Sequence, residues 1–195
     1  HVNMHLGGSS SLCAVVNGVS QGASHGLSPQ GGLPQNNRIG DLDPYALDLV
    51  MRNEGWSFAE VLDQCANESG LLGICGYNDL RDIQDGVERG DERCRLAIEV
   101  LATAARDWLG SFVVEMGGLD AISFTGGIGE YSTLVRREIL RDLDFLGVNV
   151  DPAKNETVQG EGTLHAESSP VVIHVLRTDE ELVVARQTCE FLVKS

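Results

Sequence analysis

The segment Thr125-Gly126-Gly127-Ile128-Gly129-Glu130 places three glycines in four positions, directly after an apolar run. Because glycine has no Cβ, such a turn lets the backbone approach a bound molecule and aim its amides at a phosphate. A tight packing turn would need the same residues, and both interpretations stay open on the turn alone. The spacing is not that of a Rossmann fingerprint, and the Lys-Ser/Thr ending of a Walker loop is missing.

A second small-residue segment, residues 5–11 with the sequence HLGGSSS, follows a short stretch with the character of a strand interior. Glycines and hydroxyl groups at the end of a strand suit a phosphate group. They suit an ordinary hairpin equally well. This segment therefore predicts either a phosphate contact or a simple turn.

Arg38 lies in a long loop, residues 26–44, that contains three prolines and four glycines. Ordered loops of this length in a compact domain are usually functional or disordered. An arginine on such a loop can stabilise the charge that builds on a phosphoryl group during transfer. The simpler alternative is a surface ion pair with Asp41 or Asp43, which composition alone favours.

The elements that must position these segments begin with strands. Residues 1–22 are expected to form two or three short strands, with Asn17-Gly18 as a hairpin turn. Helices are then expected over about 44–53, from a Ser57–Glu60 capping box to before Gly70, after Asn78-Asp79, and over 91–116. The polar residues of 91–116 fall in a narrow stripe, so most of its circumference is expected to be buried.

The remaining chain predicts a β–turn–α unit, with a strand over 119–124, the turn 125–130 and a helix over 132–143. Residues 151–169 are polar and are expected to form a hairpin or loop. The apolar run 171–176 is typical of a strand in a sheet buried on both faces. A final helix is expected from about Asp179, with Thr178 and Glu181 as a second capping box. The fold class predicted is α/β with a mixed sheet flanked by helices.

Composition limits the function further. The 195 residues fit one full-sized domain, and the net charge of −15 argues against nucleic acid and acidic membrane surfaces as partners. It does not exclude a nucleotide, whose phosphates backbone amides and a cation can hold. The five cysteines are scattered, which indicates reduced thiols in a cytoplasmic protein rather than a zinc site. The chain starts at His1 inside a predicted strand, so we expect a fragment or processed half whose missing portion lies upstream.

Taken together and in order, five motifs resemble the C-terminal half of the acetate and propionate kinase family, within the actin–sugar kinase–Hsp70 superfamily. The family patterns are HLGNGxS, GFTPLEGLxMGTRSGDIDP, Asp-Phe/Cys-Arg, FTAGIGEN and TNEEL, matched by residues 5–10, 26–44, 79–81, 124–131 and 178–182. The resemblance covers essentially the whole chain. It implies that residues 1–195 form one actin-like ATPase (ribonuclease H-like) domain, the C-terminal nucleotide-binding domain, with the N-terminal domain absent.

The resemblance also implies a function. Family members move a phosphoryl group between ATP and a short-chain carboxylate such as acetate, giving ADP and an acyl phosphate. By this resemblance His5 would contact the phosphoryl group in flight, and Arg38 would neutralise its equatorial oxygens. The nucleotide-binding residues would be, on the phosphate side, Gly7, Gly8 and Ser9, and, on the adenosine side, Asp79, Arg81, Gly127, Ile128, Gly129 and Glu130.

Glu180 would hold Mg²⁺ through water, although an acidic residue at this helical position can simply favour the helix dipole. The missing half would supply the acyl-binding groups, so this chain alone is expected to be inactive. The expected partners are a small carboxylate, a nucleotide, that half and a second copy of the chain, whose dimer contact the long apolar helix 91–116 suggests. An alternative is a catalytically impaired nucleotide-binding or regulatory/dimerisation module, which departures from the family pattern and the helix 91–116 motivate. The departures are Gly8, Asn36, Asn37, Ile39 and Tyr131.

Overall fold

The computed structural model describes the backbone of residues 1–194 and the side chains of these residues except Glu180 and Lys194. A six-stranded sheet with the order β3-β2-β1-β4-β6-β5 forms its centre. The strands are β1 (Val2–Leu6), β2 (Ser10–Val16), β3 (Val19–Ala23), β4 (Ala121–Thr125), β5 (Gly162–Thr163) and β6 (Val172–Val175). β1, β4 and β6 run parallel, and the other neighbours are antiparallel. The α/β fold with a mixed sheet is confirmed.

The first three strands follow from period-2 patterning and from one turn. Val2, Met4 and Leu6 of β1 are buried, whereas Asn3 and His5 between them are half-buried on the opposite face. Successive side chains of a strand point to opposite faces, which explains this alternation. It places the His5 side chain on the face away from the core. The hairpin between β2 and β3 turns at residues 17–18, as predicted.

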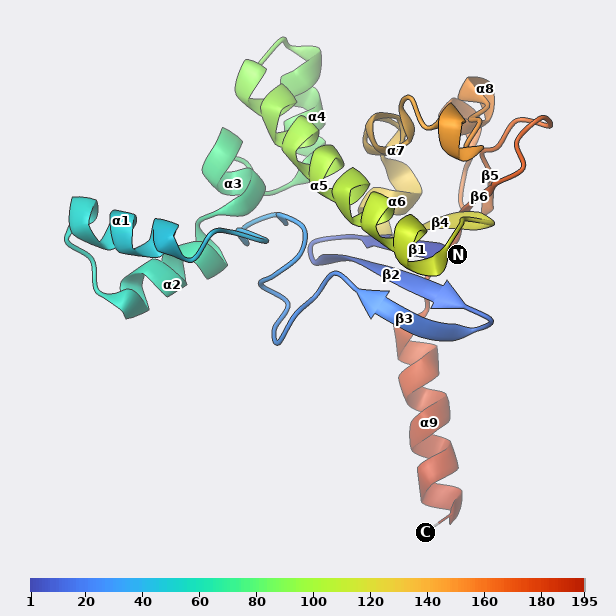
Figure 1. Cartoon of the computed structure of the whole chain (residues 1–195), viewed down its shortest axis with the longest axis horizontal. Coiled ribbons are helices and arrows are strands. Elements are labelled where there is room, and N and C mark those ends of the chain that lie inside the picture. Colours follow the sequence, from blue (N-terminus) through green and yellow to red (C-terminus); the bar gives the residue numbers. More distant parts are fainter. Residues whose placement is uncertain (195) are drawn as a thin grey trace.

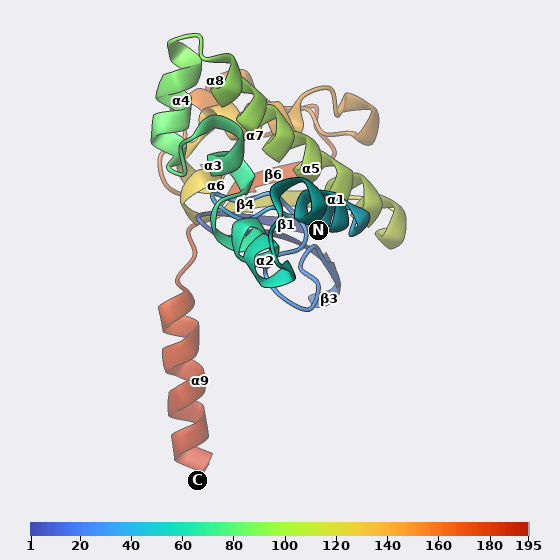
Figure 2. The same ribbon diagram turned by 90° about the vertical axis from the view of Figure 1, so that its left-hand side faces the viewer.

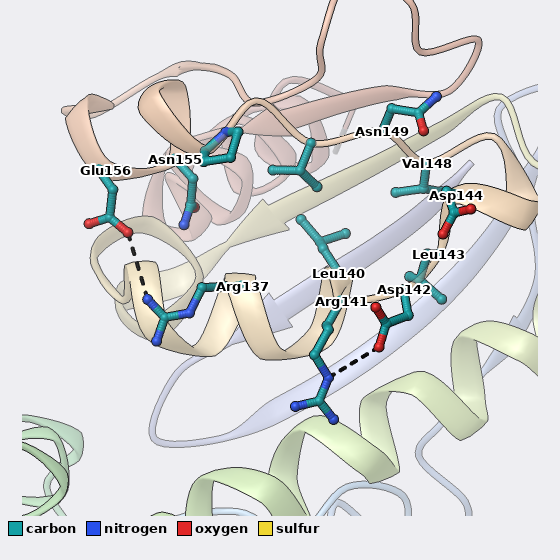
Figure 3. A pocket seen from close by; sticks show the side chains of 12 residues that line it. Arg137, Leu140, Arg141, Asp142, Leu143, Asp144, Val148, Asn149, Asn155 and Glu156 are labelled. Atoms are coloured by element: carbon teal, nitrogen blue, oxygen red, sulfur yellow. Dashed lines mark ion pairs between the residues drawn. The ribbon is translucent and has the colours of Figure 1, made fainter.

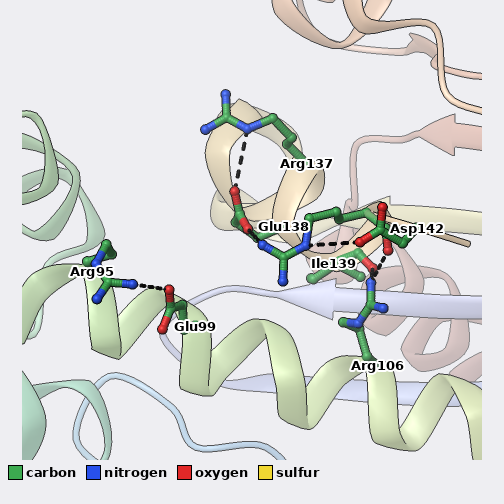
Figure 4. Close-up of polar contacts among 8 residues, drawn as sticks. Arg95, Glu99, Arg106, Arg137, Glu138, Ile139 and Asp142 are labelled. Carbon is green, nitrogen blue, oxygen red and sulfur yellow. Dashed lines mark hydrogen bonds and ion pairs between the residues drawn. The ribbon is translucent and has the colours of Figure 1, made fainter.

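One face of the sheet carries α5 (Glu92–Met116) and α7 (Thr133–Leu140), which pack against each other (Figure 1). Arg106 of α5 ties the two helices together, because its Nη1 donates to the carbonyl oxygens of Ile139, at 2.9 Å, and of Arg141 (Figure 4). The prediction that most of α5 is buried was wrong. Leu96 is 48% exposed and Val114 is 82% exposed, because α5 covers the sheet from one side only.

Four helices connect β3 to α5, and three of them were predicted. They are α1 (Tyr45–Glu54), α2 (Phe58–Asn67), α3 (Gly70–Cys75) and α4 (Leu80–Glu88). The capping box of Ser57 and Glu60 at the start of α2 is present. The pair α1 and α2 extends sideways from the sheet (Figures 1 and 2). The short α3 was not predicted, since its six residues carry neither a capping signal nor a helical period.

Two segments predicted as irregular contain helices. The 125–130 turn continues into α6 (Gly126–Tyr131), and Ser132 then caps α7. The 151–169 segment holds α8 (Pro152–Thr157) as well as β5, so the prediction of only a hairpin or loop was wrong there. Asp151 caps α8 by accepting from the amides of Ala153 and Lys154, and proline follows at the first helical position. The helix predicted over 132–143 ends earlier, at Leu140, before the 3-10 turn η1 (Asp144–Leu146).

The C-terminal part differs from its prediction in two respects. In β6, Ile173 and Val175 are buried but Val172 and His174 are only half-buried, so this strand is covered on one face rather than two. The last helix, α9 (Glu180–Lys194), leaves the body of the molecule and does not cover the sheet (Figures 1 and 2). The cap of α9 is also different, because Asp179 Oδ1 accepts the amide of Leu182 at 2.9 Å. In the part of the chain described, no helix has the length and apolar character needed to cross a membrane.

Candidate functional site

The two glycine-rich segments meet at one edge of the sheet. β1 and β4 are parallel neighbours, and their register pairs His5 with Thr125 at the carboxyl ends of both strands. The Nδ1 of His5 lies 3.1 Å from the Oγ1 of Thr125, within hydrogen-bond distance. In open α/β sheets, ligands bind outside the carboxyl ends of such strands. The sequence did not single out Thr125 as the partner of His5, because the pairing depends on the register of two strands far apart in the chain.

Gly126 is a packing residue that joins these segments. Its φ is +76°, and a Cβ at this position would lie 2.6 Å from the carbonyl oxygen of Leu6. No other residue type would allow α6 to start this close to the end of β1. The next glycine is different, because Gly127 is exposed and a Cβ there would meet nothing within 4 Å. The segment therefore combines a packing contact at Gly126 with an open backbone at Gly127.

Gly129 and Glu130, both predicted on the nucleotide side, lie buried beneath this open backbone. Their carbonyl oxygens accept hydrogen bonds from Nη1 of Arg136 at 2.9 and 2.8 Å. Arg136 is completely buried and also donates from Nε to the Oδ1 of Asn155 at 2.9 Å. Burial lowers the pKa of Arg136. This buried arginine was missed from sequence, because Arg137 and Glu138 follow it directly and make it look like part of a polar surface.

A cavity of about 610 Å³ opens beside the two segments. Its walls come from four parts of the chain: the turn after β1, the loop 26–44, the start of α4, and α6 with the start of α7. The residues that line it are Gly7, Gly8, Asn36, Asn78, Asp79, Leu80, Arg81, Gln84, Gly127, Ile128, Tyr131 and Ser132. The structure thus brings six of the predicted nucleotide-binding residues to one cavity. Ser9, Gly129 and Glu130 are not among the lining residues.

Asp79 and Arg81 form the wall at the start of α4. Asp79 is the N-cap of the helix and accepts from the backbone amide of Arg81 at 2.9 Å and from its Nη2 at 2.6 Å. These hydrogen bonds, of which the side-chain ones are the larger cause, hold the pKa of Asp79 down at about 2. The Arg81 side chain is 87% exposed. A short hydrogen bond between Ser132 and Gln84 joins this wall to α7.

The loop that carries Arg38 is anchored on α3. The carbonyl oxygens of Gln35 and Asn36 accept the amides of Leu71 and Leu72, each at 2.9 Å. Gly70 makes this approach possible, since its φ is +60° and a Cβ there would lie 2.1 Å from the Gln35 carbonyl oxygen. The sequence analysis missed this role of Gly70, whose only signal was a glycine after a helix.

Arg38 is oriented by two side chains rather than by an acidic partner. Its Nη1 donates to Ser9 Oγ and to Gln35 Oε1, both at 3.1 Å. The acidic residues proposed as surface partners have other contacts, because Asp41 accepts the amide of Gly32 and Asp43 that of Tyr45. The guanidinium therefore lies next to the turn that follows β1. His5 and Arg38, the two residues predicted to act on the phosphoryl group, therefore both lie beside the turn that follows β1.

The prediction that Glu180 holds Mg²⁺ concerns a side chain that lies outside the described residues. Within the described part of the chain, no group of three or more His, Cys, Asp or Glu side chains is placed to hold a metal ion.

A second cavity of about 350 Å³ lies between α7, α8 and η1, away from both glycine segments (Figure 3). Four of its charged side chains are paired with one another, as Figure 3 shows for Arg137 with Glu156, at 3.8 Å, and for Arg141 with Asp142, at 3.5 Å. The floor between these pairs is apolar. None of the residues predicted for the site reaches this cavity, so the candidate site is the cavity at the carboxyl ends of β1 and β4.

Comparison with known proteins identifies the family of this chain. Residues 1–186 match the Acetokinase family. The chain is 41% identical over 186 residues to a propionate kinase of Yersinia enterocolitica, covering 95% of the chain and 45% of that protein. It is 40% identical over 192 residues to an acetate kinase of Staphylococcus haemolyticus, covering 97% and 48%. The solved acetate kinase of Porphyromonas gingivalis has a TM-score of 0.93 at 34% identity, over 98% of this chain and 48% of that one, which confirms the predicted fold. The chain spans about half the length of these relatives.

Proposed function

Because this chain belongs to the acetokinase family, we propose that it is the nucleotide-binding half of a phosphotransferase acting between ATP and a short-chain carboxylate such as acetate. The products with ATP as donor are ADP and an acyl phosphate. The observation that carries the proposal is the convergence of the two glycine segments and the start of α4 on one 610 Å³ cavity, beside Arg38.

The nucleotide lies along this cavity. The base and ribose contact Ile128, the open backbone at Gly127 and the start of α4, while the phosphates extend toward Gly7 and Gly8. Two features support this direction. An exposed glycine backbone lets a flat base approach closely, and the amides of the turn after β1 can donate to phosphate oxygens. The Asp79–Arg81 pair forms the rim on the adenosine side.

Arg38 and His5 act on the phosphoryl group during transfer. Phosphoryl transfer asks little covalent chemistry of a protein and depends on positioning and on stabilising negative charge. Arg38 is fixed by Ser9 and Gln35, so its guanidinium is preorganised beside the turn rather than free in solution. His5 is held through Nδ1 by Thr125, which leaves its Nε2 on the side of Gly7.

Mg²⁺ enters this proposal together with the nucleotide, since this ion is usually bound through substrate phosphates, waters and one or two carboxylates. Glu180 as the protein carboxylate stays a prediction from the resemblance. Dimerisation through this half and a cytoplasmic location also stay predictions. The carboxylate substrate is proposed to be held by the part of the relatives' length that this chain does not span, and closure of the two parts completes the site.

The test is an assay for acyl phosphate in the full-length polypeptide that carries this chain. With ATP, Mg²⁺ and acetate, propionate or butyrate, hydroxylamine should trap the product as a hydroxamate. Calorimetry with ADP on the same preparation separates binding from transfer. ADP binding without hydroxamate from any of the three acids would replace the proposal with a non-catalytic nucleotide-binding module. If the protein showed no ADP binding and no hydroxamate formation, both proposed functions would be refuted.

A further inference from the structure

We infer that the side-chain amide of Asn36 binds the phosphates of the nucleotide, in the space above Gly8. This inference rests on the proposed function and adds to it a ligand-binding residue that the family pattern does not contain. It concerns affinity for the phosphate chain, not the transfer step.

The position of Asn36 is the first observation. It lines the 610 Å³ cavity together with Gly7 and Gly8, although it belongs to a different segment of the chain. A Cβ built on Gly8 would lie 3.8 Å from the Nδ2 of Asn36. The amide of Asn36 therefore reaches the place that a side chain on residue 8 would fill.

The second observation is that the backbone of Asn36, and not its side chain, anchors the loop. The backbone carbonyl of Asn36 accepts the amide of Leu72 at 2.9 Å, which anchors the loop. The side-chain Oδ1, in contrast, is buried and accepts no hydrogen bond within the described part of the chain. This oxygen can accept only from an N–H or O–H group, so it is not the end of the amide that a phosphate would meet. The donor end, Nδ2, lies on the side of Gly8.

The chemistry of the surroundings selects the phosphates. Asn36 lies on the Gly7–Gly8 side of the cavity, and two residues further along the loop Arg38 donates to Ser9 in the same turn. The apolar contact for a base, Ile128, lies on a different wall of the cavity, formed by α6. The Nδ2 of Asn36 is a neutral donor that can bind a phosphate oxygen beside these groups.

A third observation comes from the sequence itself. In the patterns that this chain resembles, asparagine follows HLG and glycine precedes the Thr-Arg pair. Here the two residue types are exchanged, with glycine at position 8 and asparagine at position 36. Because the two positions face each other across the cavity wall, the exchange keeps one amide in one place. Two departures that suggested an impaired site thus become a single compensated change.

The experiment compares ADP and adenosine binding by calorimetry in the full-length polypeptide. Asn36→Gly should weaken ADP binding by roughly 10- to 100-fold, the range expected for a lost hydrogen bond to a charged group, and leave adenosine within about 2-fold. Gly8→Asn combined with Asn36→Gly should recover most of the ADP affinity. Asn37→Gly is the matched control, because the side chain of Asn37 is next to Asn36 in sequence but does not line the cavity. This variant should change the affinity for ADP and for adenosine by no more than about 2-fold.

Equal loss of ADP and adenosine affinity in Asn36→Gly, or no loss of either, would overturn the inference. Asn36→Asp provides a second test that keeps the size of the side chain, and it should weaken ADP more than adenosine because it brings a negative charge to the phosphates. Failure of the unaltered protein to bind ADP would overturn the proposed function and the inference together. ADP binding without acyl phosphate would overturn the proposed transfer alone, and the Asn36 comparison would still decide the inference.

Discussion

The Nη1 of Arg38 donates a hydrogen bond to the Oγ of Ser9 at 3.1 Å across 29 positions of sequence. This bond fixes the arginine of the Pro/Gly-rich loop against the turn that follows β1. The same loop is anchored from behind, where Gly70 lets α3 approach the carbonyl oxygen of Gln35. The charge that the proposed reaction needs is therefore positioned by contacts on two sides of the loop.

Replacing Arg38 by alanine should reduce acyl phosphate formation by about 10³-fold or more, the effect of removing an arginine that stabilises a transferring phosphoryl group. ADP affinity should change much less, because the charge acts mainly in the transition state. Arg52→Ala is the control, since Arg52 forms an exposed pair with Asp48 on α1 and should leave the rate unchanged. Equal hydroxamate rates for the Arg38 and Arg52 variants would contradict the role proposed for Arg38.

Gly70→Ala should destabilise the protein by more than about 1 kcal/mol, because alanine at a positive φ is strained and its Cβ would lie 2.1 Å from the Gln35 carbonyl oxygen. Gly110→Ala is the matched control for the same substitution without steric conflict, because Gly110 lies inside α5 with nothing within 4 Å of a new Cβ. That change should stabilise the protein by roughly 0.5–1 kcal/mol, as alanine favours a helix over glycine. Urea unfolding of both variants measures the difference, and the same sign of effect at both positions would refute it.

Arg136→Met should destabilise the protein by about 2–5 kcal/mol, because the carbonyl oxygens of Gly129 and Glu130 would stay buried without a donor. The neighbouring Arg137 is exposed, and Arg137→Met should cost less than about 0.5 kcal/mol. Denaturant unfolding gives both values. The Arg136 variant should also weaken ADP binding, because α6 forms a wall of the cavity. A stable Arg136→Met protein would show that these hydrogen bonds do not hold α6 in place.

The carboxyl group of Asp79 should titrate with a pKa of about 2, and Arg81→Ala should raise this value toward the ordinary range. Since the folded pKa is lowered, the contribution of this carboxylate to stability is present above its unfolded pKa, about 3.9. It is lost as the pH falls from there through 2. Two-dimensional NMR of the carboxyl carbon follows the titration directly. An Asp79 midpoint near 4 in the unaltered protein would refute the pairing with Arg81.

Several elements could be predicted because their signals are local. The Asn17-Gly18 turn, the Ser57–Glu60 capping box and the helix start after Asn78-Asp79 each depend on residues within four positions of one another. The residue types that make short-range hydrogen bonds of this kind can be read directly from the sequence. The predictions were wrong where they concerned how much of a helix or strand is buried. How much of α5 and β6 is covered depends on which other elements pack there, and α9 extends away from the body of the molecule (Figures 1 and 2).

The sequence by itself determined the alternation of strands and helices, the order of the five motifs and the residue types that could meet a phosphate. Only the tertiary structure decided which of them share a cavity. The register of β1 and β4 brings His5 to Thr125, and the close approach at Gly126 sets α6 against the end of β1. The anchoring of the loop 26–44 on α3 puts Asn36 next to Gly8, 28 positions away. Such contacts join residues far apart in the chain, so they follow from sheet register and from steric fit between packed elements, which no local pattern records.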